Sequence, residues 1–66
     1  MSYDVYVSDF KTGKFYIVRN LFAVSKLEAE QFAIDHVMKQ IKMPNSYRHF
    51  LHVGQVFCVI DCHNIR

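Results

Sequence analysis

The residues that could do chemistry lie toward the C-terminal end of this 66-residue chain. His49 and His52 form one pair, and Cys58, Cys62 and His63 form a second group. Both spacings serve zinc when the ligands lie on a helix or a tight knuckle. A cysteine with a histidine nearby also suits nucleophilic catalysis, which needs a thiolate beside a base. Which chemistry is available therefore depends on the elements that carry these side chains.

A strand is the element that the sequence predicts for the cysteines, because β-branched and aromatic residues dominate the segment around them. Four residues along a strand span about 13 Å, whereas the Cα atoms of a disulfide lie within about 7 Å of each other. We therefore expect Cys58 and Cys62 to be reduced and buried, as small hydrophobic groups. On a strand, His49 and His52 would face opposite sides. The sequence thus predicts no metal site, no cofactor and no catalytic residue, and the protein is not expected to be an enzyme.

Size and composition limit the remaining classes of function. The chain is 52% hydrophobic and 15% aromatic, which predicts a single domain, residues 1–66, with a packed core. No run of uncharged residues approaches the roughly 20 that a membrane span needs, and the N-terminal residues lack the features of a secretory signal. We expect a cytoplasmic protein without membrane contact that is monomeric when free. A net charge of +2 with scattered lysines and arginines disfavours nucleic acid as a partner.

The first half of the chain predicts a β-hairpin followed by a helix. Tyr3–Ser8 and Lys14–Arg19 are rich in aromatic and β-branched residues, and Gly13 between them can take the positive φ of a tight turn. The second of these strands is more uniformly apolar, so we expect it to be the more central one.

A helix is predicted from Ser25 to Lys42. Ser25 and Glu28 form a capping box, in which the Glu28 carboxylate reaches back to the N–H group of Ser25. One stripe of the helix is apolar and is expected to pack on a sheet: Ala33, Ile34, Val37, Met38 and Ile41. Pro44 ends the helix, because proline disfavours helical geometry in the residue before it.

Two further strands are predicted after the helix, Tyr47–Val53 and Val56–Cys62, joined by a two-residue turn at Gly54 and Gln55. The last strand is apolar on both faces as far as Asp61, so we expect it in the interior of the sheet. The order is ββαββ, or ββαβ if residues 47–53 are irregular. The fold class is therefore α+β, with one antiparallel sheet and a helix on one of its faces.

The polar face of the helix is the predicted partner-binding site. Phe32 lies at its centre, and a ring in such a place is typical of an interface anchor. The residues that surround it are Glu28, Asp35, His36 and Lys39. An alternative is that the Phe32 ring packs beneath the segment 47–50 as that segment returns past the helix.

The C-terminal residues resemble a known family. The pattern of Cys58, Asp61 and Cys62 within a strand, four residues before the end, is similar to the C-terminus of Dmd (discriminator of mRNA degradation), the small antitoxin family of T4-type bacteriophages. Chain length and element order are also similar, although this chain has no tryptophan and has additional residues within 43–54.

This resemblance implies a function in the bacterial host. A Dmd-like protein would bind an endoribonuclease toxin of the RnlA/LsoA type by protein–protein contact and block it, which protects phage mRNA. Two alternatives remain open from the sequence. One is a small nucleic-acid-binding module that uses Lys11, Lys14, Arg19 and Arg48. The other is an inhibitor of a different host defence, such as an anti-CRISPR.

Overall fold

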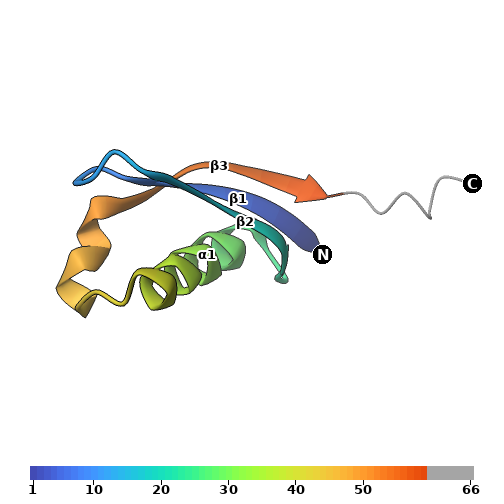
Figure 1. Ribbon diagram of the computed structural model, residues 1–66. Helices are drawn as coiled ribbons and strands as arrows, with labels where there is room; N and C mark the ends of the chain where they lie inside the picture. The colour runs from blue at the N-terminus through green and yellow to red at the C-terminus, as the bar shows by residue number, and fades with distance from the viewer. Residues whose placement is uncertain (60–66) are drawn as a thin grey trace, which may run out of the picture.

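The computed structural model describes residues 1–59 and shows a sheet with one helix packed on one of its faces (Figure 1). In chain order the elements are β1 (Ser2–Asp9), β2 (Phe15–Phe22), α1 (Lys26–Ile41), the 3₁₀ helix η1 (Asn45–Phe50) and β3 (Leu51–Val59). The predicted α+β class, with a hairpin, a helix and a C-terminal strand, is confirmed. Part of the sequence interpretation depends on three residues that lie outside the described part of the chain: Asp61, Cys62 and His63.

The strand order is β2-β1-β3, and β1 is antiparallel to both of its neighbours. The expectation that the second strand is the more central one, and that the last strand is interior, is wrong. Since β2 and β3 both run antiparallel to β1, they run parallel to each other, and α1 carries the chain back between them. That crossover leaves room for β1 in the middle. The apolar residues on both faces of β2 therefore do not reflect burial on both faces.

The helix begins and ends as its local sequence predicts. The Ser25 hydroxyl oxygen accepts a hydrogen bond from the N–H group of Glu28 at 3.2 Å. The Glu28 carboxylate accepts from the N–H group of Val24 at 2.9 Å, one residue earlier than the capping box predicts. Lys42 closes the helix in the left-handed region, with φ of 55°, and its N–H group donates to the Met38 carbonyl at 3.0 Å. These bonds satisfy backbone groups that a helix end leaves unpaired.

The segment after the helix differs from its prediction. Tyr47–Val53 is not a strand, because residues Asn45–Phe50 form η1 and the strand begins at Leu51. The predicted turn at Gly54 and Gln55 is also wrong, since β3 continues through both residues. Gln55 lies opposite Tyr6 and Val53 lies opposite Val7, so Gly54 is the additional residue of a β-bulge. A glycine inside a strand marks such a bulge as well as a turn.

The fully buried centre of the core between sheet and helix consists of small residues, and tyrosine, methionine and leucine side chains surround it. The largest fully buried side chains are Val5, Val7 and Val37, and Ala29 and Ala33 bring the helix close to the sheet. The predicted stripe of α1 faces this core, with Ala33, Val37 and Met38 buried and Ile34 and Ile41 packed at its border. None of the six phenylalanines is buried, since Phe50 is half-buried and the others are exposed. Most of the bulky aromatic material is therefore on the surface.

Candidate partner-binding surfaces

The predicted site on α1 is a shallow hollow. Its lining comprises Leu21 from the end of β2 and four of the five predicted residues: Phe32, Asp35, His36 and Lys39. Glu28, the fifth, does not line this hollow, and its carboxylate caps the helix. The Phe32 ring is 41% exposed, which makes it partly packed and partly available for contact.

The alternative position for Phe32, beneath the segment 47–50, is not what the structure shows. No residue of that segment lines the Phe32 hollow, and the rings of Tyr47 and Phe50 lie against each other with centroids 5.1 Å apart. The segment is instead connected to α1 by an ion pair between Arg48 and Asp35, with a nitrogen-to-oxygen distance of 2.6 Å. Both partners of this pair are exposed enough that it stabilises the fold by only about 0–1 kcal/mol.

A larger apolar surface lies on the other side of the molecule, on the face of the sheet that α1 does not cover (Figure 1). Side chains alternate between the two faces along a strand. In β1, Val5 and Val7 are buried toward α1 while Tyr6 is exposed. The strand register places Ile17 of β2 opposite Tyr6, and Phe15 opposite Ser8. We call this surface the open sheet face and define its apolar residues as Tyr6, Phe10, Phe15, Ile17, Phe22, Phe57 and Val59.

The exposed rings of the open sheet face reach the upper end of the apolar area that folded monomers usually leave uncovered. The most exposed rings are Phe15 at 77%, Phe22 at 76% and Phe10 at 69%, followed by Phe57 at 48% and Tyr6 at 38%. With about 200 Å² per ring, these five rings expose roughly 600 Å². The largest apolar patch on a typical monomer is about 300–600 Å² and is often functional. Ile17 and Val59 add further apolar area, so the face is a candidate binding surface.

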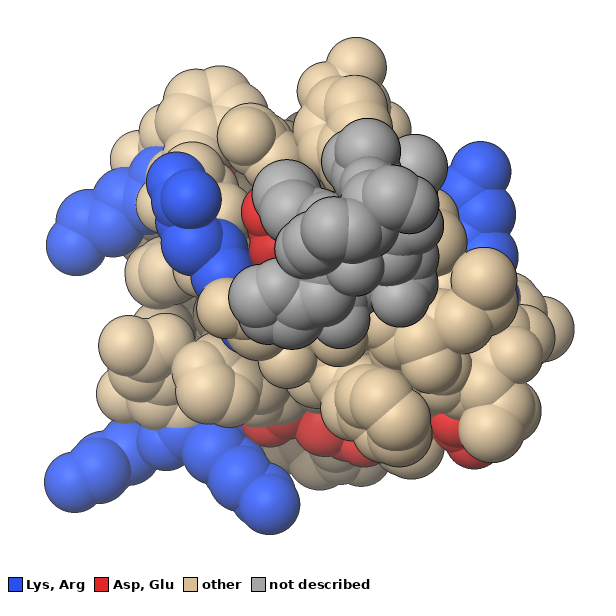
Figure 2. Space-filling model, turned by 90° about the vertical axis from the view of Figure 1, so that its right-hand side faces the viewer, with Lys and Arg blue, Asp and Glu red and all other residues tan. Residues whose placement is uncertain are grey.

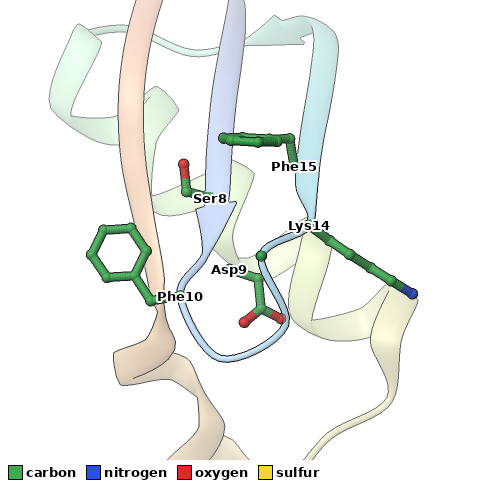
Figure 3. Close-up of a pocket in the computed structure, with 6 residues that line it drawn as sticks. Ser8, Asp9, Phe10, Lys14 and Phe15 are labelled. Carbon is green, nitrogen blue, oxygen red and sulfur yellow. The ribbon is translucent and has the colours of Figure 1, made fainter.

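Two aromatic pairs give the open sheet face its shape. The rings of Phe10 and His52 are stacked, with centroids 4.4 Å apart, and those of Tyr6 and Phe57 meet edge to face at 5.6 Å. At the hairpin end, Phe10 and Phe15 lie on either side of Ser8 and border a hollow (Figure 3). Asp9, Gly13 and Lys14 complete its lining. This hairpin hollow offers two exposed rings to a side chain of a partner.

The buried side chain of Asp9 connects the hairpin end to the rest of the molecule. Its buried carboxylate accepts hydrogen bonds from the N–H groups of Lys11 at 2.9 Å and Thr12 at 3.2 Å, and from the Tyr47 hydroxyl at 2.6 Å. Gly13 takes the predicted positive φ, at 78°. The carboxylate thus connects the β1–β2 turn to η1, and it fixes the turn that carries the hairpin hollow.

The hydrogen bonds of Asp9 change two pKa values. Desolvation raises the pKa of Asp9, but the bonds from the Tyr47 hydroxyl, from the backbone of Thr12 and Lys11 and from the Thr12 hydroxyl outweigh it, and the net pKa is lowered. The bond to Asp9, followed by desolvation and by the negative charge of Asp9, raises the pKa of Tyr47 to about 12. Both shifts favour an ionised Asp9 beside a neutral Tyr47 at neutral pH.

The histidines and the described cysteine occupy positions that differ from their predictions. His49 lies on η1 rather than on a strand, with ring Nδ1 2.6 Å from the Ser46 carbonyl oxygen. His52 stacks on Phe10. Cys58 has a free thiol and is exposed rather than buried, because β3 is an edge strand. Within residues 1–59, no three His, Cys, Asp or Glu side chains are grouped so as to hold a metal ion.

Charge does not gather into a basic surface where Figure 2 views the molecule. Lysine and arginine side chains project at separate places around the rim of this view, with uncharged surface between them. No helix within the described part of the chain is long and apolar enough to cross a membrane.

Comparison with known proteins does not add to this description: no known protein family, curated protein or solved structure matches the chain. The sequence interpretation predicted a site around Phe32, whose hollow four of the five predicted residues line, and it did not predict the open sheet face. A signal for that face was present, since Phe15 and Ile17 are apolar at alternating positions of β2. Phe22 gives no such signal, because only the register shift beside Asp4 brings it to the same face. The apolar pattern of this strand instead favours the central position that is predicted for it from the sequence.

Proposed function

We propose that this protein is a phage antitoxin that binds a bacterial endoribonuclease toxin of the RnlA/LsoA type and blocks it by protein–protein contact. The binding would protect phage mRNA in the cytoplasm of the infected bacterium. No chemistry of the antitoxin itself is required. The similarity of Cys58, Asp61 and Cys62 to the C-terminal pattern of the Dmd antitoxins supports the choice of toxin.

The observation that carries the proposal of a binding protein is the position of the phenylalanines. A domain of this size has little core to spare, yet five of its six phenylalanines are exposed. Exposed apolar surface has a free-energy cost in water of about 25 cal/mol per Å². Aromatic residues in large contiguous patches are typical of protein interfaces, whose centres are enriched in rings and poor in charge. The Phe32 hollow on α1 adds a second, smaller surface of the predicted kind.

A second candidate function is the binding of single-stranded nucleic acid, which one observation favours. Some RNA-binding domains stack bases on aromatic side chains of an exposed sheet, and the open sheet face also presents rings. Such domains combine their rings with a positively charged groove that follows the phosphates. Here the net charge is only +2, and Asp4 lies in the central strand of the sheet with its side chain accepting from the N–H group of Asn20. Protein binding is therefore the better supported function.

The proposed function is tested with purified protein and a purified RnlA-type ribonuclease. The expected result is that a stoichiometric amount of the protein stops cleavage of a labelled RNA and that the two proteins elute as one complex. The complex should form at both low and high salt, because burial of rings releases no counterions, whereas binding to phosphates weakens steeply with salt. Undiminished cleavage at a large excess of protein would refute the antitoxin function for that toxin.

A further inference from the structure

The structure assigns the docking of the toxin to the open sheet face, which the toxin covers with an apolar surface of its own. This step rests on the proposed function, because the toxin is the occupant that it names. In the complex the sheet would lie between α1 on one side and the partner on the other, so that both of its faces are buried. The sequence-based site around Phe32 becomes the smaller of two contacts.

Area is the first reason for this assignment. A stable protein–protein interface buries about 800 Å² on each partner. The five rings of the open sheet face expose roughly 600 Å² when each ring counts about 200 Å², and Ile17 and Val59 bring the total closer to that requirement. The Phe32 hollow contains one partly packed ring. Of these two surfaces, both formed by residues within 1–59, the open sheet face is therefore the one that can supply more of an interface.

The form of the sheet edges shows why the face, rather than an edge, is the docking surface. A partner strand that joins a sheet needs a regular edge with a row of free backbone groups. The register between β1 and β2 shifts beside Asp4, and Asn20 has a positive φ of 55°. The register of β3 shifts at Gly54. Bulges of this kind protect edges from pairing, so both outer strands are poorly suited to strand addition and contact through side chains is favoured.

The chemistry of the face defines the partner surface that fits it. The positions along the central strand that point to this face are Ser2, Asp4, Tyr6 and Ser8, and Asp4 is already hydrogen-bonded to the backbone of Asn20. The neighbouring positions in β2 and β3 are mainly aromatic or aliphatic. A complementary surface is therefore apolar where it meets the rings and polar where it meets the serines and Asp4 of the central strand. The hairpin hollow between Phe10 and Phe15, at one end of the face, would receive one apolar side chain of the toxin.

The experiment compares exposed apolar residues on and off this face. Phe15→Ser and Phe57→Ser remove rings from the open sheet face, on β2 and β3 respectively. Leu27→Ser is the matched control, because Leu27 is 64% exposed but belongs to α1, on the other side of the sheet. Each variant is first checked for folding by its urea midpoint. Inhibition of the purified RnlA-type ribonuclease is then titrated at equal concentrations of folded protein.

We expect Phe15→Ser and Phe57→Ser each to weaken inhibition at least tenfold and Leu27→Ser to leave it within twofold of the wild type. If both face variants inhibit the ribonuclease as strongly as the wild type, the assignment of the face is overturned and the antitoxin function remains supported. Absence of inhibition by the wild type would overturn both. Sedimentation of the free protein and binding of a labelled single-stranded RNA test the other occupants. The wild type could form a dimer or an RNA complex that both face variants fail to form. Either result would overturn the assignment of the face to the toxin.

Discussion

Replacement of Phe32 by alanine tests the structure most directly. The sequence allows an exposed interface anchor or a packed ring at this position, and the observed ring is partly exposed and partly packed. It is 41% exposed, so roughly three-fifths of its surface is packed. For an aromatic side chain of about 200 Å², that is about 120 Å², or about 3 kcal/mol at 25 cal/mol per Å². Because a denatured chain already buries part of this surface, we expect Phe32→Ala to lower the free energy of unfolding by about 2 kcal/mol.

The measurement is a urea titration of wild type and mutant. A domain of this length has a free energy of unfolding of about 3–10 kcal/mol, so the mutant should remain folded with a midpoint lower by about 1–2 M urea. Phe22→Ala is the matched control, since Phe22 is 76% exposed and its truncation should cost less than about 1 kcal/mol. Equal midpoints for the two variants would refute the packing of Phe32 described here.

The same variant separates folding from binding. If Phe32 contacts the toxin, Phe32→Ala at equal folded concentration should weaken inhibition by about 2 kcal/mol, which is about thirtyfold. Inhibition equal to that of the wild type would remove Phe32 from the interface. The open sheet face would then be the remaining candidate for contact with the toxin.

Three further outcomes are expected. The stability that Asp9 and Tyr47 contribute should be constant between about pH 4 and pH 10: the part from the lowered pKa of Asp9 is lost as the pH falls through that pKa, and the part from the raised pKa of Tyr47, about 12, is lost as the pH rises toward it. Asp9→Asn should flatten the acid limb of a melting-temperature profile, and an unchanged limb would contradict the role of Asp9. Cys58 should react with a thiol reagent in the native protein at nearly its denatured rate, whereas slow reaction would contradict its exposure. Ser25→Ala should cost about 1 kcal/mol in a urea titration, because the cap of α1 loses its acceptor.

The parts of the fold that sequence could predict are those that neighbouring residues determine. The bounds of α1 follow from Ser25, Glu28 and Pro44, which lie within a few residues of the helix ends that they set. The hairpin follows from Gly13, whose φ of 78° a residue with a side chain rarely adopts. In each case the cause and the element are adjacent in the chain, so no tertiary information was needed.

Strand order and the form of the segment 45–59 depend on contacts between distant residues. The pairing of β3 with β1 rather than with β2 depends on how α1 crosses the sheet, and no residue of β3 encodes it locally. The segment η1 is connected to the β1–β2 turn by the bond from Tyr47 to Asp9, two residues separated by 38 positions. Gly54 illustrates the same limit, because a glycine in an apolar run is compatible with a turn and with a bulge.

The candidate site could be predicted only in part, for a physical reason. Helical periodicity identifies a ring that is out of place, as it did for Phe32, because a polar face is visible in the sequence. An apolar sheet face that serves binding has the same pattern as a face that is buried in the core. The apolar residues of β2, Phe15 and Ile17 among them, therefore favour a central strand when only the sequence is considered. The hydrophobic pattern of a sequence therefore does not distinguish a binding surface made of hydrophobic residues from a buried core.

The same arrangement explains how so small a domain can keep its rings outside and still fold. Among the described residues, its core consists of valines and alanines with two tyrosines, one methionine and one leucine, and hydrogen bonds at the hairpin end add to the contacts of this core. The Asp9 carboxylate makes such hydrogen bonds at the hairpin end, where it accepts from a backbone N–H group of the β1–β2 turn and from the Tyr47 hydroxyl. A partner that covers the open sheet face would remove apolar surface from water and stabilise the folded form by mass action. The exposed phenylalanines are thus available for the partner binding that we propose.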